Sequence, residues 1–151
     1  MSSIVSSATT PGVEQNQPLQ RKPVHFPRKL NEGIIIEGRN GPIRILPIRM
    51  DDDFGTKYKA RVLVQAPKKD NVYRDDVKET EPVIENRTGY GSLAFSRFPG
   101  SRFYINDDIT VKVKSVDKSS VVFIVFIPKN TNAYKQEDWE KVHSKWVIPT
   151  A

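Results

Sequence analysis

The feature that most constrains the fold is a short pattern that occurs twice. Pro-Lys, two further residues, then Asn-x-Tyr and a basic residue occupy residues 67–74 and again residues 128–135, 61 positions later (67 to 128). Upstream, Phe-Pro-Arg at residues 26–28 aligns with Phe-Ser-Arg at residues 95–97. Chance similarity between two β-rich stretches is the alternative, but the shared spacing favours an internal repeat.

We therefore expect two copies of one unit, at residues 23–80 and 92–148. A linker at residues 81–91 would join them, and a disordered tail rich in Ser, Thr, Gln and Pro would occupy residues 1–22. A unit of roughly 60 residues buries too little surface to be stable alone. The two copies are therefore expected to share one core.

Strand-like patterns recur along both copies. β-branched or alternating runs predict strands at residues 34–36, 43–45, 60–64, 109–113 and 121–127. The last of these runs is apolar at every position, which predicts a central strand buried on both faces. Proline cannot donate a hydrogen bond within a sheet, so Pro27 favours an edge strand or a distorted one.

A helical pattern occurs only near the end of the sequence. Trp139, Val142 and Trp146 lie at i, i+3 and i+7, with charged residues between them and Pro149 as the expected end. The matching place in the first copy, residues 75–79, is followed by Pro82 and predicts one or two turns at most. The predicted class is all-β with a short C-terminal helix.

The composition points to a polyanionic partner and away from catalysis. Lys and Arg number 24 against 18 Asp and Glu, a net charge of +6, which suits phosphate binding; a merely solvated surface is the alternative. There is no cysteine, His25 and His143 lack metal-ligand spacing, and no Gly-rich loop follows a strand. The aspartates at residues 51–53 predict a solvated turn. We expect no cofactor, no metal and no enzymatic activity.

Nothing in the sequence predicts export or a membrane span. The first residues have neither a basic segment nor a long apolar run. The longest apolar run, residues 121–128, is far shorter than a spanning helix. We therefore expect a soluble cytoplasmic protein that does not contact a membrane.

The order of the motifs resembles the carbon storage regulators, the CsrA and RsmE proteins. That family opens with a strand of the form L-I-L-T-R-R-x-G-E and continues through I-G-D-x-V-x-V and A-P-K. It ends with V-x-V-H-R-E-E-I and a helix. The second copy matches at residues 93–100, 105–111, 127–129 and 133–137, and the first at residues 26–32, 66–68 and 72–77. The resemblance covers nearly all of residues 24–143.

The resemblance implies an interleaved fold and RNA binding. Family members are homodimers that bind GGA-containing single-stranded or hairpin-loop RNA and regulate translation in bacteria. This chain holds both protomer equivalents, so it resembles a monomeric, covalently fused pseudo-dimer from a bacterium or a phage. Fusion would remove the concentration dependence of a dimer and would let the two RNA sites differ.

Each implied RNA site joins the opening strand of one copy to the last strand of the other. Site one combines Val72, Tyr73 and Arg74 with Phe95, Ser96, Arg97 and Phe98. Site two combines Phe26, Arg28 and Lys29 with Ala133, Tyr134 and Lys135. Arginine forks suit phosphates or guanine, and rings can stack on unpaired bases. Core packing of the rings and solvated arginines are the alternatives.

Both sites depart from the family pattern. Lys135 stands where the family has arginine, and an ammonium group cannot reproduce a bidentate fork. Together with Pro27, this predicts that site two is weaker. In site one, Phe98 replaces a basic residue. A second hypothesis is that the chain acts through protein contacts, as an assembly subunit or as a decoy for a protein antagonist. Trp139 and Trp146 would then belong to that interface.

Overall fold

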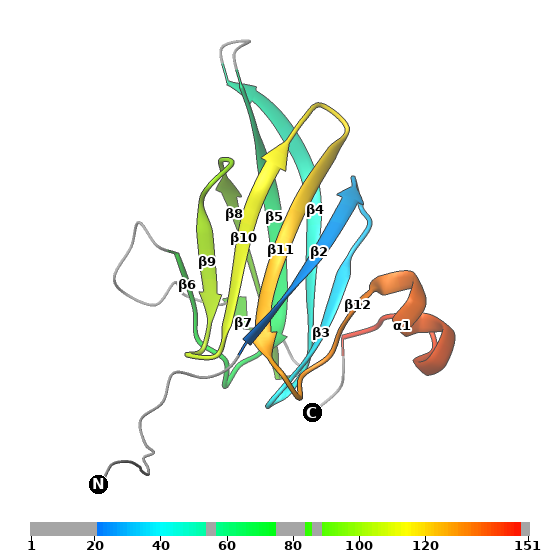
Figure 1. Cartoon of the computed structure of the whole chain (residues 1–151). Helices are drawn as coiled ribbons and strands as arrows, with labels where there is room; N and C mark the ends of the chain where they lie inside the picture. The colour runs from blue at the N-terminus through cyan, green and yellow to red at the C-terminus, as the bar shows by residue number, and fades with distance from the viewer. Residues whose placement is uncertain (1–20, 54–56, 75–83, 86–88, 149–151) are drawn as a thin grey trace, which may run out of the picture.

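The chain folds into two antiparallel sheets and one helix (Figure 1). The computed structural model describes residues 21–53, 57–74, 84–85 and 89–148. The five-stranded sheet has the order β2 (Arg21–Lys29), β11 (Ser120–Pro128), β10 (Ile109–Val116), β9 (Arg102–Ile105), β6 (Val72–Arg74). The six-stranded sheet has the order β12 (Ala133–Lys135), β3 (Ile34–Gly38), β4 (Gly41–Asp53), β5 (Lys57–Pro67), β8 (Tyr90–Arg97), β7 (Ile84–Glu85). Helix α1 (Gln136–His143) follows β12, so the predicted class is confirmed.

Each sheet contains strands from both halves of the sequence. β2 and β6 from the first half flank β9, β10 and β11 from the second. In the other sheet, β8 and β12 from the second half flank β3, β4 and β5 from the first. If β2, β3, β4, β5 and β6 are exchanged with β8, β9, β10, β11 and β12 in that order, the five-stranded sheet becomes the β12-β3-β4-β5-β8 part of the other sheet. Neither half, as described, builds either sheet by itself.

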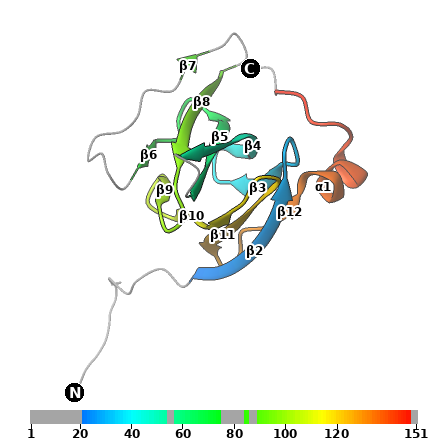
Figure 2. The ribbon, with the colours of Figure 1, turned by 90° about the horizontal axis from the view of Figure 1, so that it is seen from above.

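One apolar core lies between the two sheets, and Figure 2 looks along the strands that enclose it. Along β11 every second side chain, from Val121 to Ile127, is fully buried. Val122, Ile124 and Phe126 alternate with them and remain partly exposed on the outer face. The prediction of a strand buried on both faces was therefore wrong. A sheet in a two-layer packing has only one face against the other sheet.

The five predicted strands all exist, each inside a longer element. Pro27 lies in β2, at the edge of its sheet, as its missing N–H predicted. The predicted turn at residues 51–53 is wrong, because these aspartates form the end of β4. The strand β2 begins at Arg21, two residues before the expected boundary of 23. The rest of the expected tail, residues 1–20, and the expected turns at residues 75–79 lie outside the described residues.

The helix is shorter than its apolar spacing predicted. It ends at His143, and Ser144 has a positive φ of 94°. The chain then reverses, and the backbone N–H of Trp146 donates to Glu140 Oε2 over 2.6 Å. Trp146 is therefore not a helical residue, although its ring still lies 5.8 Å from that of Trp139. Among the described residues, no helix is long and apolar enough to cross a membrane.

Candidate nucleic-acid interface

Strands β6 and β8, which carry site one, both lie against β9. Arg97 Nη1, from β8, donates to the carbonyl of Arg102 over 3.2 Å. The ring of Phe95 meets that of Phe103 edge to face, with centroids 5.0 Å apart. On the other side of β9, Arg74 of β6 pairs in register with Phe103. We call this place, where β8 of the six-stranded sheet meets β9 and β6 of the five-stranded sheet, a seam. It brings together strands from the two halves of the chain.

Three of the seven residues of site one are buried. Val72 is 1% exposed, Phe95 4% and Arg97 6%. Besides its bond to Arg102, Arg97 donates from Nε to the carbonyl of Ser96 over 2.7 Å. These side chains have almost no surface to offer a ligand. Phe95 and Arg97 hold β8 against β9, and Val72 of β6 belongs to the core. For Phe95 this is the packing alternative that the sequence left open, whereas the solvated alternative for Arg97 was wrong.

The other four residues of site one are partly exposed: Tyr73, Arg74, Ser96 and Phe98. Two lysines that the sequence did not single out lie near Phe98, with Lys57 Nζ and Lys59 Nζ 5.2 and 5.6 Å from its ring centroid. They come from β5, which pairs with β8. A cation over an aromatic face is attracted to it and also raises the local positive potential. The exposed part of site one therefore combines rings with positive charge.

Tyr73 is held in place from two sides. Its ring stacks on Tyr104 at 5.2 Å with an interplanar angle of 24°. Its hydroxyl donates to the carbonyl of Asn106 over 3.2 Å. The ring is therefore oriented before any ligand arrives, which lowers the entropy cost of binding.

Site two is built differently, because an acidic side chain covers its arginine. Arg28 is 5% exposed, and its Nη1 and Nη2 donate to the two carboxylate oxygens of Glu137 over 2.8 and 3.1 Å. Hydrogen bonds from Arg28 lower the pKa of Glu137 below its ordinary value of 4.5. Phe26, at 4% exposure, belongs to the core. Of the predicted residues, Ala133 and Tyr134 are partly exposed and Lys29 and Lys135 are exposed.

Replacing Glu137 by glutamine is expected to lower the free energy of unfolding at neutral pH by about 1–2 kcal/mol, the scale of charge-assisted hydrogen bonds. Because the Glu137 side chain is 51% exposed, solvent screening reduces the effect below that of a fully buried pair. The depressed pKa makes this stabilisation complete above pH 4.5 and lost as the pH falls through the folded-state value. Urea unfolding at several pH values should show the two proteins converging in acid. A constant difference down to low pH would contradict this linkage.

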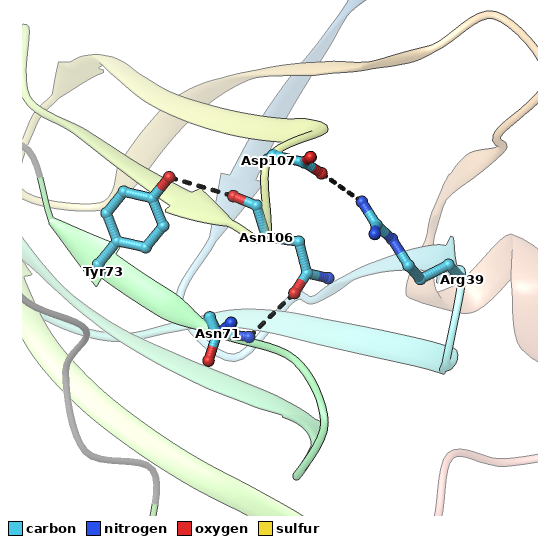
Figure 3. Close-up of a pocket in the computed structure, with 5 residues that line it drawn as sticks. All are labelled: Arg39, Asn71, Tyr73, Asn106 and Asp107. Carbon is cyan, nitrogen blue, oxygen red and sulfur yellow. Dashed lines mark hydrogen bonds and ion pairs between the residues drawn. The ribbon is translucent and has the colours of Figure 1, made fainter.

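A pocket of about 360 Å³ lies next to Tyr73 of site one (Figure 3). Arg39, the cation among its described lining residues, contacts Asp107 Oδ1 at 2.5 Å and Asp108 Oδ2 at 3.2 Å. These hydrogen bonds raise the pKa of Arg39 and lower that of Asp107. Two carboxylates more than balance the guanidinium, so the pocket is a poor phosphate site. Its residues serve to position the seam.

The backbone at the asparagine of the repeated motif makes a structural contact at this pocket. The N–H of Asn71 donates to Asn106 Oδ1 over 3.0 Å, and the N–H of Asn106 donates to the carbonyl of Asn71 over 2.7 Å. In the second copy, the carbonyl of Asn132 accepts from the N–H of Glu37 over 2.9 Å. In each case the residue before a short strand, β6 or β12, is bonded to the end of the strand with which it pairs, β9 or β3. The repeat spacing was the signal for this contact.

The fold defines a two-sheet β protein in which each half of the chain contributes strands to both sheets. Within the described ranges, no three His, Asp or Glu side chains gather closely enough to hold a metal ion. No protein-family model, curated protein or solved structure matches the chain. The resemblance to the carbon storage regulators therefore stays a hypothesis.

Proposed function

We propose that the chain is a single-chain pseudo-dimer of the carbon storage regulator type that binds single-stranded RNA. In this proposal, site one recognises GGA-type elements in messenger or regulatory RNA, and binding regulates translation in the cytoplasm. The protein acts as a monomeric binding protein and not as an enzyme. Site two is the weaker of the two sites.

The observation that carries the proposal is the strand order of the two sheets. The resemblance implies that each RNA site joins the opening strand of one copy to the last strand of the other. Strand β8 belongs to the second half and β6 to the first, and both contact β9 through Arg97, Phe95 and Arg74. Strands β2 and β12 are the corresponding edge strands of the two sheets at the other seam.

The partly exposed side chains of site one suit an unpaired, charged polymer. The guanidinium fork of Arg74 can take the O6 and N7 acceptors of guanine or bridge two phosphate oxygens. The ring of Phe98 offers a stacking surface, and Lys57 and Lys59 beside it supply charges for phosphates. Site two has its arginine occupied by Glu137, which supports the proposed inequality of the sites.

The protein-contact hypothesis has less support. It relied on the unequal sites and on two tryptophans being available to a partner, but Trp146 Nε1 donates to Gln65 Oε1 over 3.2 Å. Its ring lies under the guanidinium of Arg44, at 5.8 Å from the ring centroid. Contacts inside the chain thus account for this residue.

An electrophoretic mobility shift with a GGA-loop hairpin and a scrambled-loop control tests the proposal. We expect a shift for the GGA hairpin only. If three or four phosphates are contacted, the slope of log K against log salt should be about −2 to −3, from roughly −0.7 for each contact. Equal binding of both hairpins, or binding of neither, would reject sequence-selective recognition.

A further inference from the structure

The outer face of the five-stranded sheet carries a hollow that lies outside the residues predicted for either site. Its volume is about 270 Å³, and it is lined by Arg21, Arg102, Tyr104, Thr110, Lys112 and Phe126. These residues come from four strands that adjoin one another in the sheet, β2, β11, β10 and β9. We call this surface the outer platform.

The outer platform combines positive charge with flat rings. Its six described residues include three cations and no carboxylate. Arg21 Nη1 donates to Thr110 Oγ1 over 2.8 Å, which holds this guanidinium over the sheet. Arg102 and Lys112 pair in register on β9 and β10, so their charges are neighbours. Such a charge distribution favours an anionic partner, and rings between cations suit stacked bases more than a bare phosphate.

The equivalent place on the six-stranded sheet is already covered by an aromatic ring. Next to edge strand β12, Ile35 of β3, Arg44 of β4 and Gln65 of β5 face one another in one row across the sheet. The indole of Trp146 lies on this row, through its bond to Gln65 and its contact with Arg44. Ile35 is fully buried.

On the five-stranded sheet the same row consists of Tyr104, Thr110 and Phe126. Counted from edge strand β6, these residues face one another across β9, β10 and β11 in the register of the sheet. Tyr104 and Phe126 are partly exposed. On the six-stranded sheet this row is covered by the flat indole of Trp146. On the five-stranded sheet the corresponding row is lined by rings and cations, so a flat heteroaromatic group fits there.

We propose that the outer platform binds a single-stranded RNA segment that flanks the element held in site one. Bases stack on Tyr104 and Phe126, and phosphates lie against Arg21, Arg102 and Lys112. Tyr73 connects the two surfaces, since it belongs to site one and stacks on Tyr104. The identity of the polymer as RNA rests on the proposed function, whereas the charge and the rings of the platform do not. Stacking accepts any base, so this binding is independent of sequence.

The test compares four RNAs by fluorescence anisotropy, with a scrambled-loop hairpin as a fifth: a GGA-loop hairpin, the same hairpin with a single-stranded extension of about eight uridines at one end or at the other, and the uridine strand alone. The extension is placed at the 5′ end in one probe and at the 3′ end in another. For the native protein, one of the two extensions should tighten binding about tenfold, as expected for one or two stacked bases. The uridine strand should bind more weakly than either hairpin.

The variant with Phe126→Leu and Lys112→Gln removes a ring and a charge from the outer platform. We expect it to bind the bare hairpin like the native protein and to lose the gain from the extension. The matched control, Ile124→Leu with Lys118→Gln, makes one aliphatic change on the same face of β11 and removes one charge from the exposed turn before it. It should keep the gain, and thermal unfolding should show both variants folded.

The outcomes separate this inference from the proposed function. If the native protein binds the bare hairpin but neither extension adds affinity, the outer platform is not an RNA surface and site one stands. The same conclusion follows if the platform variant keeps the gain. If the native protein does not distinguish GGA from scrambled loops but binds the uridine strand, and the platform variant does not, the selective function fails and the platform inference holds. If none of the RNAs binds, both are overturned.

Discussion

Replacing Phe103 by alanine is expected to lower the free energy of unfolding by about 3–5 kcal/mol, the range for truncating a buried aromatic side chain. Phe103 is fully buried and meets Phe95 edge to face across the core, 5.0 Å between centroids. It lies on β9, which contacts β6 and β8 at the seam. The cavity left by alanine would therefore lie where strands of the two halves meet. Domains of this size are commonly stable by only about 5–15 kcal/mol, so the loss would be severe.

Phe126→Ala is the matched control, because it removes the same atoms from the same sheet. Phe126 points to the outer face of β11 and is partly exposed, so the lost burial is smaller and no closed cavity forms. We expect a loss of about 1 kcal/mol. Equilibrium unfolding in urea, with equal m-values for the two variants, gives the comparison. Equal losses would mean that the inner and outer faces of this sheet are wrongly assigned.

The second large effect concerns RNA affinity. The double change Arg74→Gln and Phe98→Leu is expected to weaken binding of the GGA hairpin about 100-fold or more. One bidentate contact and one stacked base are each worth roughly 1–3 kcal/mol, and about 1.4 kcal/mol corresponds to a factor of ten. Both residues are partly exposed, and thermal unfolding of the double variant checks that the fold is kept. Dissociation constants from titration of labelled hairpin measure the effect.

The corresponding change at the other seam is the control for charge. Lys29→Gln and Lys135→Gln remove two exposed cations from site two. With Arg28 engaged by Glu137, we expect these changes to weaken hairpin binding by no more than about threefold, the scale of two screened surface charges. A larger loss here than at site one would reverse the proposed ranking of the sites. Arg97→Gln is a poor test of contact, because Arg97 is buried and its loss would disturb the seam.

Local patterns in the sequence predicted much of the secondary structure. The run of three isoleucines at residues 34–36 forms a strand because β-branched side chains favour extended structure, and all three are buried. The alternating run at residues 109–113 is a strand because successive side chains on a strand point to opposite faces. Pro27 indicated an edge strand because it has no N–H to share with a second neighbour. The repeated Asn-x-Tyr spacing marked the approach to β6 and β12, where Asn71 and Asn132 make matching backbone contacts.

Burial could not be predicted in the same way. Arg97 and Arg28 were expected to face RNA, but both are buried beside backbone carbonyls, and Glu137 covers Arg28. Trp146 continued the apolar spacing of a helix, yet the positive φ of Ser144 ends α1 and places the indole against Gln65. The sequence did not predict that Lys57 and Lys59 belong to site one, because their proximity to Phe98 depends on the pairing of β5 with β8.

By itself the sequence predicted a mostly β protein with an excess of basic residues and one short helix near its end. These properties follow from side-chain periodicity, proline and charge, which act over a few residues or by simple summation. The exchange of strands between the two halves was expected only from the family resemblance, and the structure shows it. The tertiary structure alone decided which face of β11 is buried and which aromatic and basic side chains meet on the outer platform. Those outcomes depend on contacts between residues far apart in the chain, where the free energy of packing one sheet against the other selects among faces that local patterns leave equivalent.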